Sequence, residues 1–308
     1  MYEEKYKKLK ELRKKCIIGV IILLVVFVII IGIAVYGTTN IEIINKIENP
    51  IIPTAIMIVF YVVLLIVIAA KFIEPHRLYR IQLSNEIKND ILGRKISNSF
   101  GPDYKIEDPF EFYEELKQIN FARHYPVTNN KLALKYNNIR LKYVYCDIYQ
   151  PDDDGVRRFF RGDVFVFNLK ESISGDLYIG KKEKFILGDI SELENLISYN
   201  SNIKEIKPTN SILKDTIEVR SSSYCNLIDN QPFQETLNNI FETEINFLIY
   251  RDNKVFVFVN NKEELFNIKI DNSSKEQQAE VLFEQDVEKL KQRLNEVLKY
   301  KDSLYIGE

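Results

Sequence analysis

Two long uncharged runs lie close together near the start of this chain, at residues 17–36 and 51–70. Each is about 20 residues long, the length that an α-helix needs to cross roughly 30 Å of hydrocarbon. A charged side chain at the centre of such a helix costs about 2.5–3.5 kcal/mol, so uncharged runs are typical of membrane spans. The sequence therefore predicts a two-helix transmembrane hairpin over residues 17–70, with a short external loop at 37–50.

The basic residues predict the orientation of this hairpin. Seven Lys and Arg residues lie in the segment 1–16, and Lys71, Arg77 and Arg80 follow the second run, whereas the loop between the runs holds a single lysine. By the positive-inside rule we expect a multi-pass protein of the cell membrane with both termini in the cytoplasm. The basic N-terminus either serves only to set this topology or also attracts anionic membrane lipids.

Residues 71–308 are soluble in character and long enough for one large or two small domains. The polar segment 200–210 is the best candidate for an internal boundary. Residues 72–308 carry 33 Lys and Arg against 39 Asp and Glu. Because a nucleic-acid binder needs a basic footprint, we expect no nucleic-acid partner.

Hydrophobic periodicity predicts an α+β fold for this part of the chain, with helices at both ends of a run of strands. A helix is expected to continue inward from the second span at 77–95, and an amphipathic helix is expected at 277–300. Between them we expect a mainly antiparallel sheet, with Gly162 as a bulge and residues 164–167 covered on both faces. The segments 245–250 and 254–260 are expected to form a hairpin, with residues 255–259 inside the sheet. Its strands are predicted at 139–149, 156–169, 177–187, 215–222, 245–250 and 254–260, and short helices at 110–120, 191–199 and 232–241.

Two apolar surfaces are candidates for contact with a partner. The last helix carries an apolar stripe with the 4-3-4-3 spacing of a coiled-coil seam. The strand at 139–149 places aromatic side chains on one face. The stripe either packs onto the domain's own sheet or contacts another protein or a second copy of the chain, and the aromatic face of the strand is a second candidate contact surface. The candidate contact residues are Phe283, Val287, Leu290, Leu294, Val297, Tyr143 and Tyr145.

No motif for catalysis, metal binding or nucleotide binding is present in the sequence. The acidic turn at 152–155 lacks the ligand spacing of a calcium loop, and the serines before Cys225 lack a nucleophile elbow. We therefore expect no catalytic residue, no metal and no cofactor. The alternative is a membrane-tethered hydrolase or nucleotide-responsive effector, for which the best residues are His124, Asp152, Asp154 and Ser222.

Several local stretches together resemble a known family. These are the helix around 77–96 leading to Tyr104, the stretch 160–167 (FRGDVFVF) followed by 175–179, and a late series at 217–222, 233–241 and 255–259. With the preceding hairpin, their order resembles the bacterial family called domain of unknown function 3137. The resemblance implies a two-span membrane protein with a cytoplasmic α+β domain. It implies no catalytic or binding residue.

The sequence thus favours a membrane-anchored cytoplasmic module that binds a protein partner or a second copy of itself. Anchoring confines such a domain to two dimensions and raises its effective concentration toward membrane partners. A further alternative is an accessory subunit of a membrane transport complex, whose partner would contact the two spans.

Overall fold

The computed structural model describes residues 2–39, 51–107, 125–152, 155–173, 175–181, 204–206, 217–221, 227 and 230–307. The chain forms two compact units. The first unit combines Met1–Asp90 with Ile268–Glu280, and the second combines Ile91–Asn267 with Val281–Glu308.

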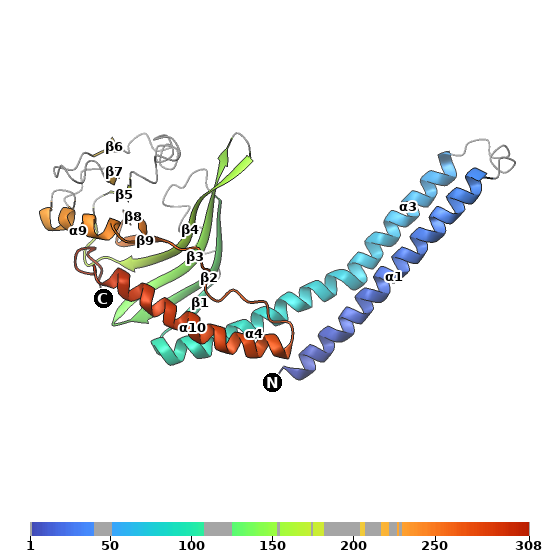
Figure 1. Cartoon of the computed structure of the whole chain (residues 1–308), viewed down its shortest axis with the longest axis horizontal. Coiled ribbons are helices and arrows are strands. Elements are labelled where there is room, and N and C mark those ends of the chain that lie inside the picture. The colour runs from blue at the N-terminus through green and yellow to red at the C-terminus, as the bar shows by residue number, and fades with distance from the viewer. Residues whose placement is uncertain are drawn as a thin grey trace. The chain divides into compact units, whose positions relative to one another are not determined.

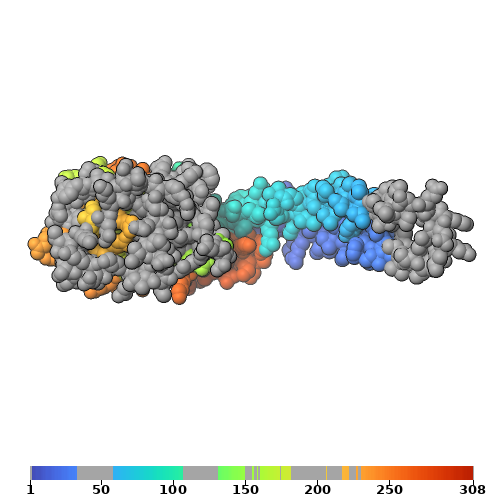
Figure 2. All heavy atoms as spheres, turned by 90° about the horizontal axis from the view of Figure 1, so that it is seen from above, coloured from blue at the N-terminus to red at the C-terminus, as the bar shows by residue number. Residues whose placement is uncertain are grey.

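The first unit is built around two long apolar helices. Helix α1 (Glu3–Thr39) lies along α3 (Ile51–Ile68). The rings of Phe27 and Tyr61 pack between the two helices, with their centroids 5.6 Å apart. Figure 2 shows the two helices side by side. Their apolar side chains are open to the surroundings: Val28 exposes 66% of its surface and Val59 62%. Both helices are long and apolar enough to cross a membrane.

The second apolar helix continues directly into the next one, as the sequence predicts. A π-helical turn, η1 (Ala69–Ile73), joins α3 to α4 (Glu74–Phe100). Gly19 of α1 faces this turn, where an added Cβ would lie 3.0 Å from Ile68 and 3.2 Å from Phe72. Glycine therefore lets α1 approach η1 closely.

The second unit contains one antiparallel sheet of nine strands in the order β1-β2-β3-β4-β9-β8-β5-β7-β6. With helices α9 (Gln231–Phe241) and α10 (Ser273–Leu298), it confirms the predicted α+β class and the mainly antiparallel sheet (Figure 1). The strands are β1 (Lys105–Glu107), β2 (Tyr125–Tyr136), β3 (Ile139–Asp152), β4 (Gly155–Asn168), β5 (Leu177–Lys181), β6 (Lys204–Glu205), β7 (Ile217–Ser221), β8 (Ile245–Arg251) and β9 (Lys254–Asn260).

Both faces of the central strands are buried. On β4 the four residues Val164 to Phe167 expose at most 4% of their surface, which confirms the prediction that this stretch is covered on both sides. One face carries an apolar cluster that includes Val144, Val166 and Phe258. The opposite face carries Tyr143 and Tyr250. Phe233 of α9 packs against Tyr250, and Arg293 of α10 bonds to Asp163 beside Tyr143.

The predicted bulge at Gly162 is wrong. Gly162 pairs regularly with Cys146 of β3 and Asn260 of β9, and the register shift lies where Ile148 and Tyr149 pair with β4. Glycine is needed at position 162 for a different reason. A Cβ there would lie 2.0 Å from the carbonyl oxygen of Val259, so only glycine allows β9 to approach this closely.

The hairpin of β8 and β9 and the central position of β9 are confirmed. The predicted short helices at 110–120 and 191–199 lie outside the described residues, as does most of the segment 200–210. Strands on both sides of 200–210 belong to the same sheet.

Candidate functional site

The seven residues predicted as contact surfaces are buried within the chain. The five apolar residues of α10 expose at most 2% of their surface, and Tyr143 and Tyr145 expose none. The stripe on α10 is therefore core packing, one of the two alternatives that the spacing left open, and the tyrosine face is covered as well. This corrects the prediction of an exposed contact surface at Phe283, Val287, Leu290, Leu294, Val297, Tyr143 and Tyr145.

A buried polar network lies on the tyrosine face. The carboxylate of Asp163 is fully buried and accepts three hydrogen bonds: from the Tyr143 hydroxyl at 2.9 Å, from the Asn261 amide at 3.1 Å and from Arg293 Nη1 at 2.8 Å. Arg293 comes from α10 and Asp163 from β4. The pair thus ties the last helix to the centre of the sheet.

The electrostatics of Asp163 are those of a structural group. Burial raises the pKa of Asp163 to about 6, against the opposing attraction of Arg293 and the three hydrogen bonds. Neighbouring Tyr145 accepts a hydrogen bond from Arg161 at 2.6 Å. Because every oxygen of Asp163 is already bonded inside the protein, we assign this network to stability and to the docking of α10.

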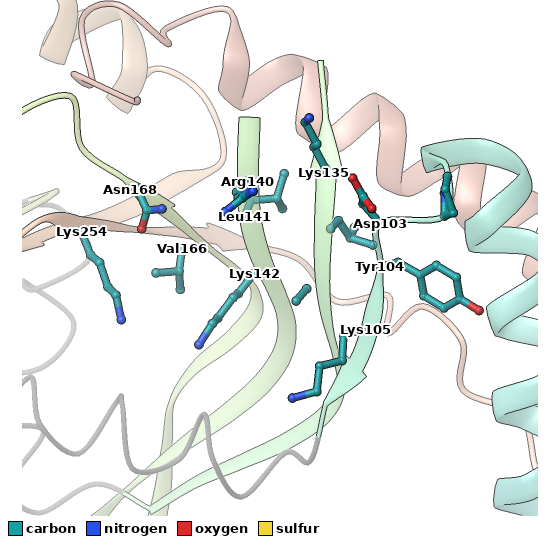
Figure 3. Close-up of a pocket in the computed structure, with 13 residues that line it drawn as sticks. Asp103, Tyr104, Lys105, Lys135, Arg140, Leu141, Lys142, Val166, Asn168 and Lys254 are labelled. Carbon is teal, nitrogen blue, oxygen red and sulfur yellow. The ribbon is translucent and has the colours of Figure 1, made fainter. Parts of the chain in front are cut away.

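The opposite face of the sheet holds the candidate functional site, a hollow of about 590 Å³. Figure 3 shows that its lining comes from β1, β2, β3, β4 and β9 and from the residues just before β1. Among the described residues, five basic side chains and one carboxylate, that of Asp103, line the hollow. We call it the basic hollow; its basic residues are Lys105, Lys135, Arg140, Lys142 and Lys254.

The strand register explains why these cations gather. Lys105 lies opposite Ala133, which pairs with Lys142, and Lys135 lies directly opposite Arg140. All five basic residues belong to the face of the sheet that also carries Val166. In Figure 3 the side chains of Lys105, Lys142 and Lys254 extend to the same side of the sheet.

The pairing of Lys135 with Arg140 is unfavourable for the isolated fold. Like charges directly opposite each other on neighbouring strands are destabilising. The cost falls if an anion enters the hollow, because each ammonium or guanidinium group donates charge-assisted hydrogen bonds to carboxylate or phosphate oxygens. Val166 and Ala133 supply an apolar floor. The hollow is therefore chemically suited to hold an anionic group of small-ligand size.

Sequence reasoning missed the basic hollow. Its cations come from four strands, β1, β2, β3 and β9, that span most of the domain's sequence, and the domain as a whole is acidic. The only local signal is the alternation of Arg140 and Lys142 on one face of a strand, which a solvated strand face also shows.

The described part of the chain does not test the residues of the enzymatic alternative. His124, Asp154 and Ser222 lie outside the described residues, and Asp152 ends β3 with no side-chain placement described. Among the described residues, no group of three His, Cys, Asp or Glu side chains could hold a metal ion.

Comparisons with known proteins add little to this geometry. No family model and no curated protein matches the chain, so membership in the family that the sequence resembles stays a prediction. Among solved structures, the chain is similar to the crystal structure of the mycobacterial trehalose monomycolate transport factor A, TtfA. The two share 10% identity with a TM-score of 0.30, over 64% of this chain and 94% of the other.

Proposed function

We propose that this chain is a two-span membrane protein whose α+β domain binds an acidic segment of a protein partner at the inner face of the membrane. The basic hollow is the single observation that carries the binding role. The two exposed apolar helices support the anchor, and the seven basic residues before residue 17 support a cytoplasmic orientation. Membership in the domain of unknown function 3137 family is part of the same proposal.

The charge of the hollow suits an acidic partner. The charged groups of its described lining are four lysines, one arginine and one aspartate. Attraction between these cations and partner carboxylates, together with confinement at the membrane, gives specificity to a module of this kind.

The test is photo-crosslinking in the native membrane from the rim of the hollow. A photoreactive residue at position 135 is expected to capture one acidic partner, identified by mass spectrometry. The charge reversal Arg140→Glu, with the probe retained, is expected to reduce capture at least tenfold. The matched control is Lys299→Glu, an exposed lysine just beyond α10, and it is expected to leave capture unchanged. Equal loss in both variants, or capture unaffected by Arg140→Glu, contradicts the proposal.

A further inference from the structure

A second hollow lies in the first unit, at the end of α1 that carries the basic residues. It measures about 310 Å³ and takes its lining from three segments: α1, the start of α4, and the residues around 271. Its lining residues are Leu9, Lys10, Arg13, His76, Arg80, Asp271 and Asn272.

The walls of this hollow are fixed by specific contacts. Arg80 pairs with Asp271, and the backbone N–H of Ile270 donates to Ser84 Oγ at 3.0 Å. Tyr6 donates to Glu276 at 2.9 Å, and Leu9 is buried with 7% of its surface exposed. The first turns of α1 are therefore held against α4 and the segment 268–280, and the hollow between them is preformed.

The charge inside the hollow is not balanced. Arg80 and Asp271 neutralise each other. Among the residues that the structure describes, neither Lys10 nor Arg13 has an ion-pair partner. Two cations remain at the wall formed by α1, with the side chain of Leu9 next to them. This combination of two positive charges and an apolar contact fits a phosphate group attached to an apolar molecule.

The position of the hollow along the helices matches the headgroup layer of a bilayer. Arg13 precedes the first apolar run by four residues, about 6 Å of helix, and His76 follows the second by six residues, about 9 Å. Beyond the hydrocarbon, each side of a bilayer has an interfacial layer roughly 5–8 Å thick. Both walls thus lie at or next to the depth of lipid phosphates.

We propose that this hollow binds the phosphate of one anionic phospholipid, with Lys10 and Arg13 as its principal ligands. The inference rests on the membrane anchor in the proposed function and assigns a specific lipid site to it. Diffuse attraction of a basic N-terminus to a membrane would treat all its lysines alike, whereas a site distinguishes those that line the hollow from those that do not. Lys7 and Lys14 are exposed on α1 and do not line the hollow.

The experiment uses the full chain, delipidated in neutral detergent and titrated with phosphatidylglycerol or phosphatidylcholine. Native mass spectrometry counts the bound lipids. We expect one phosphatidylglycerol per chain and no retained phosphatidylcholine. Lys10→Gln with Arg13→Gln is expected to weaken retention at least tenfold, and the control Lys7→Gln with Lys14→Gln less than twofold.

Three outcomes overturn the inference. These are equal retention by the Lys10/Arg13 variant, equal losses in both double variants, and displacement of the lipid by millimolar inorganic phosphate, which would mark a site for a soluble anion. A separate measurement tests the membrane anchor: release of the wild-type chain from membranes by alkaline carbonate would contradict it. Partner binding is tested by the crosslinking experiment at the basic hollow, which neither double variant alters.

Discussion

Arginine side chains on the two faces of the sheet differ in burial and in the charges around them. On the helix-covered face, Arg293 exposes 12% of its side chain and is bonded to the fully buried Asp163. On the other face, Arg140 is exposed, lies opposite Lys135 and shares a hollow with three more lysines and one carboxylate. The contrast separates two uses of charge: Arg293 stabilises the fold through its ion pair, whereas Arg140 and Lys135, directly opposite each other, add a repulsion that an anionic ligand relieves.

The strongest test of this contrast removes one arginine from each face. Arg293→Met leaves Asp163 buried without its cation, so we expect the free energy of unfolding to fall by about 3–5 kcal/mol. Arg140→Met is expected to change the free energy of unfolding by less than about 0.5 kcal/mol, because the side chain is exposed and its loss leaves no buried charge unpaired. Chemical unfolding of the detergent-solubilised full chain, followed by the strand signal in circular dichroism, measures both. Equal losses of unfolding free energy in the two variants would show that Arg293 and Arg140 do not differ in their contribution to stability.

The titration of Asp163 provides the second test. Its pKa is raised to about 6 in the folded chain from an ordinary 3.8. Between these values the folded state holds a proton that the unfolded state has released, so this contribution to stability is full below about pH 3.8 and lost as the pH rises through about 6. The stability of the wild type relative to Asp163→Asn should fall by about 3 kcal/mol between about pH 4 and pH 7. If this difference in stability stays constant or rises with pH, then Arg293 and the hydrogen bonds offset the cost of burying the Asp163 carboxylate more fully than a pKa of about 6 indicates.

A third test concerns the close backbone approach beside Asp163. Gly162→Ala places a methyl group against the Val259 carbonyl, so β4 and β9 must separate, and we expect a loss of about 1–3 kcal/mol. Gly32→Ala in α1 has nothing within 4 Å and serves as the control, with no loss expected. Thermal unfolding of both variants gives the comparison. If Gly162→Ala left the stability unchanged, β4 and β9 could separate at this point without cost.

The smallest effect is expected in the basic hollow. Lys135→Gln removes one member of the like-charge pair with Arg140 and should raise the free energy of unfolding by up to about 0.5 kcal/mol at low ionic strength. The gain should vanish in about 1 M salt, where the screening length is about 3 Å. Unfolding curves at both salt concentrations measure it. A loss of stability at low salt would show that Lys135 is a structural residue like Arg293.

Much of the fold follows from local patterns in the sequence, and the candidate site does not. The terminal helix, the β8–β9 hairpin and the burial of residues 164–167 follow from periodicity and composition. The partner of Arg293 was not predictable, because Asp163 lies 130 residues earlier in the chain. Gly162 was assigned the wrong role, since a strand glycine signals either a bulge or a close approach and only the pairing decides. The hollow depends on the register of five strands, which sequence periodicity does not give.

The π-helical turn η1 has a consequence for how the chain tolerates insertions and deletions. A π-turn carries one residue more than an α-turn, and one residue corresponds to about 100° of rotation around a helix. The open apolar side of α3 and the buried side of α4, which includes Leu83 and Ile87, are therefore offset in phase by this extra residue. Deleting Ala70 would turn one stripe relative to the other by about a quarter of a circle and withdraw Leu83 and Ile87 from their packing. The turn thus sets the angular register between a surface suited to lipid and a surface suited to protein.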